Sequence, residues 1–227
     1  MASTTRRPSK ASDRRALLEE RILTVIEELL QGGVTYTELS VEQIAQAAGI
    51  SRSTFYLYFR DKVDVLLRLS VCLRSESYAI AAAWRPTGAE GGLAGLTRTY
   101  ELIMRHYRKY AALLAAIGEV AAYDPAVREA WGVYQRQFIE NTIAVLKEEQ
   151  AAGRTSAVID PELAAKVIVQ GGGQVIARQV ADGDGAHDLD VARELATGYW
   201  YGVYRRPVGS IPGPAHDEQQ GSPDSDA

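Results

Sequence analysis

The chain has 227 residues, of which 46% are hydrophobic and 24% are charged, a composition typical of a globular protein with one large or two small domains. No apolar run has the length of a membrane span, and no apolar segment follows the basic start as in a signal peptide, so we expect a cytoplasmic protein. The net charge of −4 argues against a surface that is basic throughout, but not against local binding of DNA.

The two ends of the chain differ in charge. Five of the first 15 residues are basic, whereas the last 21 residues contain four acidic side chains and no Lys or Arg. We predict a disordered basic arm over residues 1–12 and a disordered acidic tail over 207–227. The arm could enter a minor groove of DNA or simply aid solubility. Between the ends the periodicity is helical and no strand alternation is sustained, so the predicted fold class is all-α.

The first predicted helix runs from Asp13 to Leu30 and ends at Gly32-Gly33. Three helix starts then follow in close succession. Ser40 and Gln43 have the spacing of a capping box, and Gly49 is suited to the left-handed stop of that helix. Ser51 and Asp61 are the next two N-caps. Two helices of about two turns each, joined by a short turn that contains Gly, form a helix-turn-helix unit.

Longer helices are predicted for the rest of the chain. They cover Lys62 to Trp84 and then 93–106, 108–122, 126–152, 161–181 and 188–205. The run Gly171-Gly172-Gly173 lies inside one of them and costs about 1 kcal/mol per glycine relative to alanine. A glycine run at this position needs an explanation. Three explanations are open: close approach of another helix, room for a ligand, and a break in the helix.

The short helix after Ser51 has an unusual outer face. If Phe55 and Phe59 point to the core, Ser53, Thr54 and Leu57 point away from it, with Arg52 beside them. Hydroxyl groups suit phosphate oxygens, arginine suits guanine or phosphate, and small side chains let a helix enter a major groove. A generic helical domain could also contain such a helix. The longer sequence around it is therefore needed to distinguish a DNA-binding helix from an ordinary one.

The string IEELL…LSVEQIAQAAGISRSTFYLYFRDKVDVLLRL resembles the N-terminal domain of the TetR family of transcriptional regulators. The resemblance covers roughly residues 17–70, and within the family it is similar to the subgroup of the ethionamide-activation regulator. It implies a DNA-binding domain over 13–62 and an effector-binding and dimerisation domain over 63–206. It also implies phosphate contacts from Ser51, Thr54, Tyr56, Tyr58 and Lys62, and base contacts from Arg52, Ser53 and Leu57. Arg52 could instead bind phosphate or remain solvated, and Ser40 could contact phosphate besides capping its helix.

The resemblance further implies a homodimer through the last two helices and a pocket for a small apolar or aromatic effector. Gly198 and Gly202 would allow the close packing that such a dimer needs. Candidate pocket residues are mostly aromatic side chains on apolar helices, although an aromatic stripe is as often ordinary core. They are Trp84, Tyr100, Tyr107, Trp131, Tyr134, Phe138 and Gln170.

An enzyme and a protein-interaction module are the two alternatives to a DNA-binding regulator. For an enzyme, the sequence lacks nucleophile, phosphate-loop and metal-ligand motifs, so we predict no catalytic residue, metal or cofactor. A helical protein-interaction module without specific DNA binding is the alternative, but it would not need a hydroxyl-rich exposed helix. The predicted function is therefore a regulator, in the family's usual manner a repressor, that an effector releases from a palindromic operator.

Overall fold

A computed structural model describes residues 10–206, which form helices and connecting turns with no strand in that range. The all-α fold class is thereby confirmed. The predicted acidic tail and residues 1–9 of the predicted basic arm lie outside the described residues. Residues 10–12, predicted to be disordered with the arm, instead form the start of the first helix. None of the helices between residues 10 and 206 combines the length and apolar character that a membrane crossing requires.

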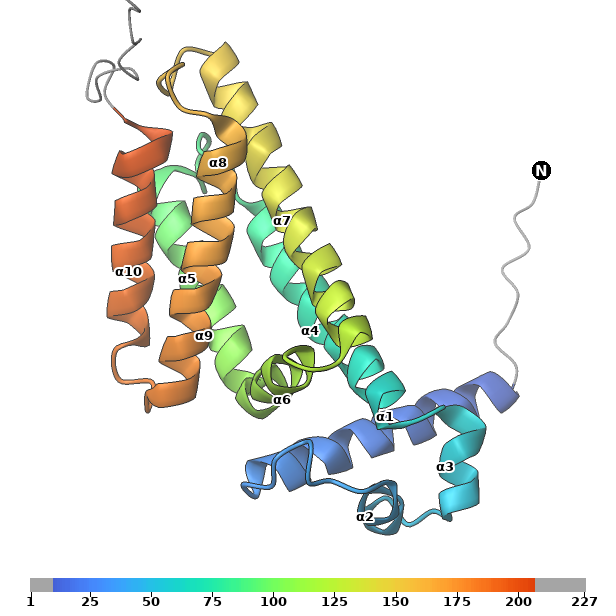
Figure 1. Ribbon diagram of the computed structural model, residues 1–227. Coiled ribbons are helices and arrows are strands. Elements are labelled where there is room, and N and C mark those ends of the chain that lie inside the picture. Colours follow the sequence, from blue (N-terminus) through green and yellow to red (C-terminus); the bar gives the residue numbers. More distant parts are fainter. Residues whose placement is uncertain (1–9, 207–227) are drawn as a thin grey trace, which may run out of the picture.

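Three helices form a unit at the N-terminal end of the described chain, at the bottom of Figure 1. They are α1 (Lys10–Gln31), α2 (Val41–Ala47) and α3 (Arg52–Tyr58). The helix α1 begins three residues before the predicted Asp13. Ile22 and Ile26 of α1, Ile44 of α2 and Phe55 of α3 are all fully buried, so the three helices share one small core.

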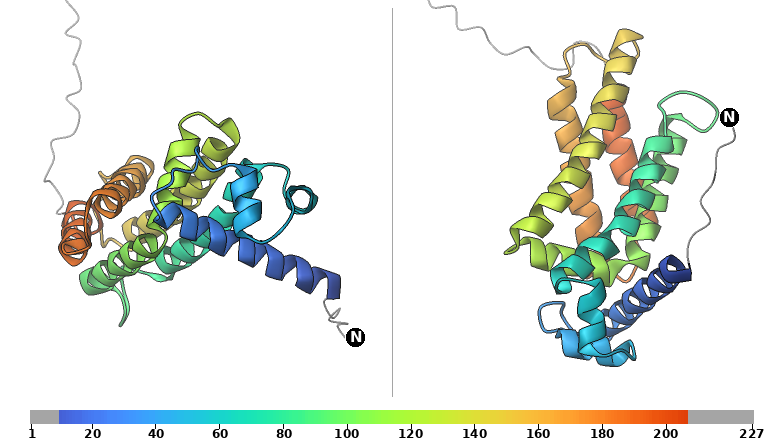
Figure 2. Two further views of the ribbon diagram at one scale, coloured as in Figure 1. Left: turned by 90° about the horizontal axis from the view of Figure 1, so that it is seen from below. Right: turned by 90° about the vertical axis from the view of Figure 1, so that its right-hand side faces the viewer.

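The remaining helices form the body of the molecule above that unit, as the right-hand view of Figure 2 shows. They are α4 (Lys62–Ala83), α5 (Gly92–Lys109), α6 (Ala111–Ala121), α7 (Pro125–Ala151), α8 (Pro161–Lys166), α9 (Gly172–Asp182) and α10 (Asp188–Tyr199). Two π-helical segments complete them, η1 (Val167–Gly171) and η2 (Trp200–Tyr204). The helix α4 extends from the N-terminal unit along the body and joins the two (Figure 1).

Two predicted boundaries in the body differ from the structure. The break predicted near residue 107 falls at Tyr110, because His106 and Tyr107 are buried and continue the apolar face of α5. The single helix predicted over 161–181 is interrupted by η1. Both differences arise from packing against other helices, which local propensity does not contain.

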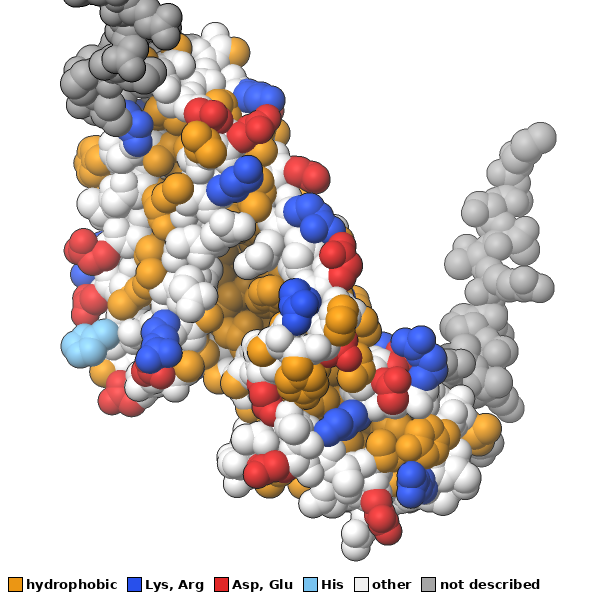
Figure 3. Space-filling model, viewed as in Figure 1, with side chains coloured by type: hydrophobic (Ala, Val, Ile, Leu, Met, Phe, Trp, Pro, Cys, Tyr) orange, Lys and Arg blue, Asp and Glu red, His pale blue; other side chains and the backbone are white. Residues whose placement is uncertain are grey.

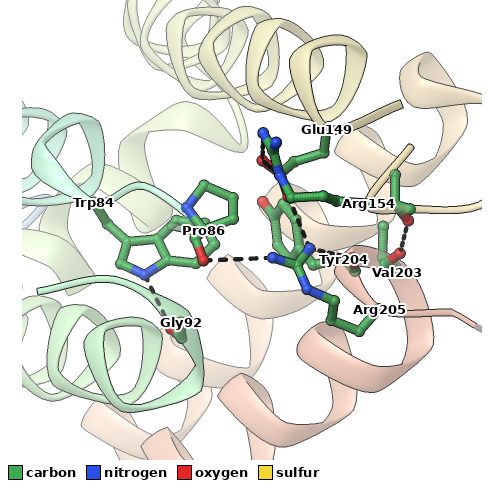
Figure 4. A network of polar contacts seen from close by, with 9 residues as sticks. Trp84, Pro86, Gly92, Glu149, Arg154, Val203, Tyr204 and Arg205 are labelled. Atoms are coloured by element: carbon green, nitrogen blue, oxygen red, sulfur yellow. Dashed lines mark hydrogen bonds and ion pairs between the residues drawn. The ribbon is translucent and has the colours of Figure 1, made fainter. Parts of the chain in front are cut away.

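An ionic cluster around the buried Glu149 is drawn in Figure 4. It lies near the C-terminal end of α7, which is remote from α1–α3 in Figure 1. Glu149 is 2% exposed and accepts hydrogen bonds from Arg154 at 2.7 Å and Arg205 at 2.8 Å. The Arg205 guanidinium also lies 4.4 Å from the ring centroid of Trp200. These contacts fasten η2 to the end of α7, and thereby hold Tyr204 edge-on against Trp84, with ring centroids 5.0 Å apart.

Candidate DNA-binding helix and ligand pocket

The turn between α2 and α3 is built from the predicted caps. The Ser40 hydroxyl accepts from the Gln43 amide at 3.2 Å, and the Gln43 side chain accepts from the Ser40 amide at 2.8 Å. Gly49 has φ +64°, a left-handed conformation that side-chain-bearing residues adopt rarely. The Ser51 hydroxyl then accepts from the Thr54 amide at 3.0 Å. The helix-turn-helix geometry is confirmed down to its individual caps.

The helix α3 buries one face and exposes the other. Phe55 and Phe59 are 0% and 1% exposed, as predicted, whereas Leu57 is 79% exposed. An apolar side chain exposed to that degree on a well-packed helix is available for a partner surface. The side chains gathered on or beside this outer face are Ser51, Arg52, Ser53, Thr54, Tyr56, Leu57 and Tyr58, with Thr54 and Tyr58 half-buried.

The polar groups of this face form a compact set. The Ser51 hydroxyl lies 2.8 Å from those of both Ser53 and Thr54. Arg52 forms no ion pair within residues 10–206, and its guanidinium carbon lies 5.7 Å from the ring centroid of Tyr56. A cation without a carboxylate partner, next to clustered hydroxyls, can meet phosphate or a base edge.

Lys62, a predicted phosphate contact, has hydrogen-bond partners within the protein. Its ammonium donates to the main-chain carbonyls of Tyr36, Thr37 and Leu39 at 3.1, 2.8 and 3.0 Å. The Tyr36 hydroxyl in turn donates to the Lys62 carbonyl. All three ammonium donors thus have carbonyl partners in the loop before α2, so the side chain braces that loop against α4.

A second side chain from α4 fixes α3 on the unit. The Arg68 guanidinium pairs with Glu19 of α1 at 2.8 Å and with Asp64 at 3.3 Å. It also lies 5.0 Å from the ring centroid of Phe59, at the end of α3. The orientation of α3 is therefore set by contacts to both α1 and α4.

The body contains a cavity of about 180 Å³ between α4, α5, α7 and the η1–α9 segment. Figure 3 shows the hollow between α9 and α7, with hydrophobic side chains at its base. Every predicted pocket residue lines this cavity: Trp84, Tyr100, Tyr107, Trp131, Tyr134, Phe138 and Gln170. The structure thus brings together side chains from four separate helical segments, and their binding of an effector stays a prediction.

The deepest polar groups of the cavity wall satisfy one another. The Tyr134 hydroxyl lies 3.0 Å from that of Tyr107 and 2.6 Å from that of Ser77, which donates to the Leu73 carbonyl of α4. Burial raises the pKa of both phenols, so they remain protonated. Because the Ser77 proton is committed to Leu73, the chain of donors runs from Tyr107 through Tyr134 to the backbone of α4.

The triple glycine serves two purposes. A Cβ atom on Gly171 or Gly172 would lie 3.3 or 3.4 Å from the Tyr199 side chain of α10, so these two positions allow close helix approach. A Cβ atom on Gly173 would meet nothing within 4 Å, and Gly173 lines the cavity. Of the open explanations, close approach and room beside a cavity both apply, and the π-helical segment η1 ends at Gly171.

Several polar lining residues escaped the sequence analysis, among them Gln135, Asn141 and Gln174. A signal for two of them was present. The spacing that joins Trp131, Tyr134 and Phe138 reaches Asn141 at its next step, and Gln174 follows Gln170 by four residues. Only aromatic side chains were considered on α7, so its amides were missed.

The body touches the N-terminal unit beneath the cavity. Glu119 at the end of α6 accepts from the Thr37 amide at 3.1 Å, and the Tyr123 hydroxyl lies 3.0 Å from that of Thr37. Leu114 of the same helix lines the cavity. The helix α6 therefore contacts the cavity and, through its C-terminal end, the loop that Lys62 braces.

Comparison with known proteins agrees with this geometry. Residues 24–69 match the family described as bacterial regulatory proteins, tetR family, and residues 96–204 match the C-terminal domain of the transcriptional regulator EthR. The HTH-type transcriptional regulator EthR of Mycolicibacterium smegmatis is 30% identical over 158 residues, 67% of this chain and 71% of that protein. The transcriptional regulator AcuR of Cereibacter sphaeroides is 28% identical over 168 residues, 70% of this chain and 74% of its own.

Solved structures share the fold at lower identity. GusR of Salmonella enterica superimposes with a TM-score of 0.63 at 19% identity, over 81% of this chain and 95% of that one. NalD of Pseudomonas aeruginosa, the secondary repressor of the MexAB-OprM multidrug efflux pump, gives 0.63 at 17% identity, over 87% and 100%. These relatives are regulators and not enzymes, which favours the predicted regulator over both alternatives. From its matched segments and its identity to EthR over two thirds of both chains, this protein belongs to the TetR family of bacterial DNA-binding transcriptional regulators.

Proposed function

We propose that the protein is a homodimeric repressor that inserts α3 into the major groove of a palindromic operator and leaves it when a small apolar or aromatic molecule fills the cavity. The observation that carries the DNA half is the outer face of α3, where Arg52 has no ion-pair partner within residues 10–206 and Leu57 is 79% exposed. In a dimer, two such helices would meet half-sites about 34–36 Å apart. A cytoplasmic location follows from this role.

The proposed contacts are divided by chemistry. Arg52, Ser53 and Leu57 face base edges, with Leu57 against a thymine methyl, while Ser51, Thr54, Tyr56 and Tyr58 face phosphates. Ser40 is foremost the N-cap of α2, and a phosphate contact is its secondary role. Lys62 is left out of the interface because its ammonium is bound to three carbonyls.

Selection of bound fragments from genomic DNA by the purified protein, at two salt concentrations, tests the proposal. We expect a palindrome whose recovery is lost in the Arg52→Ala, Tyr56→Ala double variant. Val158→Ala, a change on a side chain that is 63% exposed in the turn before α8, is the control and should recover the same palindrome. Binding without sequence preference would refute the assignment of α3.

The dimer is proposed to form through the outer faces of α9, α10 and η2. Val175, Leu189 and Tyr201 are 44%, 53% and 58% exposed there, and a Cβ atom on Gly198 or Gly202 would meet nothing within 4 Å. Apolar side chains at that exposure, beside glycines that permit close approach, suit a self-complementary interface. Sedimentation of Val175→Glu should show a monomer where the parent chain is a dimer, and an unchanged dimer would place the interface elsewhere.

The effector half rests on a cavity whose lining includes no Asp, Glu, Lys, Arg or His. Filling it would act on α4 through the Tyr107–Tyr134–Ser77 chain and on the Thr37 loop through α6. A coupling free energy of about 1–3 kcal/mol, which is typical of allosteric proteins, would lower operator affinity roughly 5- to 150-fold. If no compound in a chemical library changed the operator affinity, the proposed effector response would be contradicted, and the proposed DNA binding would not.

A further inference from the structure

The polar groups that line the cavity fall into two sets. One set is already hydrogen-bonded within the protein: Thr99 donates to the Gly95 carbonyl at 2.9 Å and Thr142 donates to the Phe138 carbonyl at 2.8 Å, besides the Tyr107–Tyr134 pair. The other set has no hydrogen bond within residues 10–206. It includes the Tyr100 and Tyr204 hydroxyls, the indole NH of Trp131, and the side-chain amides of Gln135, Asn141, Gln170 and Gln174.

Tyr100 belongs to the second set although it is almost entirely buried. Its side chain is on α5 and the residue is 8% exposed. Burial raises the pKa of this phenol well above its ordinary value, so the hydroxyl carries its proton and can donate. No fully buried side-chain nitrogen or oxygen within residues 10–206 lacks a hydrogen-bond partner, so the Tyr100 hydroxyl, which has none, must keep some surface open to the cavity that it lines. The group is therefore available to something inside the cavity.

The four amides stand around the opening. Gln170 and Gln174 are exposed and line the cavity from η1 and α9, while Gln135 and Asn141 are half-buried and line it from α7. The two pairs thus belong to the η1–α9 segment and to α7, and the hollow in Figure 3 lies between α9 and α7. An apolar interior with amides at its rim suits a molecule that has an apolar end and a neutral polar end.

The volume of the cavity and the absence of charged lining residues further restrict the ligands that it can bind. A dry apolar cavity of about 150 Å³ accepts benzene, so a cavity of about 180 Å³ accommodates one ring or a short alkyl chain. No ionised side chain lines it, and burying an ion without a partner is strongly unfavourable. A carboxylate or an ammonium at the polar end would therefore be rejected.

We propose that the cavity recognises an uncharged molecule with an apolar part the size of one ring and a carbonyl-type hydrogen-bond acceptor, which receives the Tyr100 hydroxyl proton and is flanked by the rim amides. This inference rests on the proposed function, because it takes the cavity as the effector site. It adds the selection by charge and by one hydrogen bond, neither of which an apolar pocket provides alone.

Four probes of matched size test the inference: phenylacetamide, phenylacetate, 2-phenylethylammonium and propylbenzene. Affinities can be followed by calorimetry and by the fluorescence of Trp84 and Trp131, which line the cavity. We expect phenylacetamide to bind at least tenfold more tightly than either ion. Tyr100→Phe should weaken phenylacetamide roughly 2- to 12-fold, the range for one hydrogen bond, and leave propylbenzene unchanged.

Two further variants keep the test sharp. Asn141→Leu should also weaken phenylacetamide and spare propylbenzene, whereas Val158→Ala, which is exposed and outside the cavity lining, should affect neither. Equal binding of phenylacetate and phenylacetamide, or an equal loss of both neutral probes in Tyr100→Phe, would overturn the inference while the effector site stood. Failure of all four probes to bind, propylbenzene included, would overturn the effector site itself.

Discussion

At the scale of single residues, Lys62 shows how a side chain's partners decide its role. A lysine at the start of α4, one turn from the DNA-facing helix, has the charge for a phosphate contact. Its three hydrogen bonds to carbonyls of the Tyr36–Leu39 loop instead make it a brace. Bound carbonyl groups compete directly with phosphate for the same three protons.

Replacement of Lys62 by Met separates the two roles. We expect lower thermal stability, by about 1–2 kcal/mol for lost charge-assisted hydrogen bonds at a half-buried site. Operator binding should weaken while the slope of log affinity against log salt stays the same, since no phosphate contact is removed. Fluorescence anisotropy over a salt series measures the slope, and a decrease of about 0.9 in its magnitude would restore Lys62 to the interface.

Glu149 is the second residue whose surroundings fix its behaviour. Burial alone would raise the pKa of its carboxyl, but hydrogen bonds from Arg154 and Arg205 outweigh burial and lower that pKa below the ordinary 4.5. A carboxyl with a depressed folded-state pKa contributes stability above its unfolded-state pKa and loses that contribution as pH falls through its folded-state pKa.

Glu149→Gln should therefore destabilise the protein at neutral pH and flatten its loss of stability below about pH 4.5. Breaking a fully buried ion pair costs about 3–5 kcal/mol, and we expect about 2–3 because the Arg154 side chain is 43% exposed. Urea unfolding between pH 3 and pH 7 measures both effects. If the variant and the parent lost stability in parallel as the pH fell, protonation of Glu149 would not be the cause of the parent's loss of stability at low pH.

At the scale of elements, the glycine run on η1 and α9 combines two demands. Gly171 and Gly172 let Tyr199 of α10 approach, whereas Gly173 leaves space at the cavity. A helix with three consecutive glycines is intrinsically weak, so its packing against α10 and α7 must supply the stability.

Gly173→Ala tests whether Gly173 provides space in the cavity and is not needed for close helix packing. The added methyl meets nothing within 4 Å, so the helix should gain up to about 1 kcal/mol in the free protein. The same methyl projects into the cavity and should lower the affinity for propylbenzene. Thermal unfolding with and without the probe separates the two effects, and unchanged probe affinity would show that Gly173 leaves no space that a ligand uses.

At the scale of the whole molecule, the cavity and the DNA-facing unit are linked along two routes. One passes from Tyr107 and Tyr134 through Ser77 to α4, and the other passes along α6 to Thr37. The first ends at the Leu73 carbonyl of α4, and the second ends at the loop before α2, to which Lys62 binds the start of α4. A shift of either helix would therefore turn α2 and α3 relative to the body.

Glu119→Gln with Tyr123→Phe should weaken the second route selectively. We expect the operator affinity of the ligand-free protein to change little, since neither side chain lies on α3. The decrease in operator affinity caused by the tighter-binding neutral probe, phenylacetamide or propylbenzene, should become smaller. Anisotropy titrations with and without that probe measure this coupling. Arg136→Gln, whose only ion pair within residues 10–206 is with exposed Glu129, serves as the control. A full ligand effect in the double variant would assign the coupling to α4.

The sequence alone determined the features that depend on neighbours within about four residues. The capping box at Ser40, the left-handed Gly49 and the caps at Ser51 and Asp61 are local hydrogen bonds and backbone conformations, so their residue types predict them directly. The burial of Phe55 and Phe59 followed from helical periodicity. These local signals carried the family resemblance and the all-α fold class.

The tertiary structure alone decided where distant groups meet. The partners of Lys62 lie 23 to 26 residues away and those of Glu149 up to 56, and no periodicity connects them. Aromatic residues between Trp84 and Phe138 could be named as candidates, but the packing of α5 against α7 and α9 made them walls of one cavity. The unpartnered Tyr100 hydroxyl is visible only there, because a hydrogen bond that is not made depends on the position of every group that could have made it.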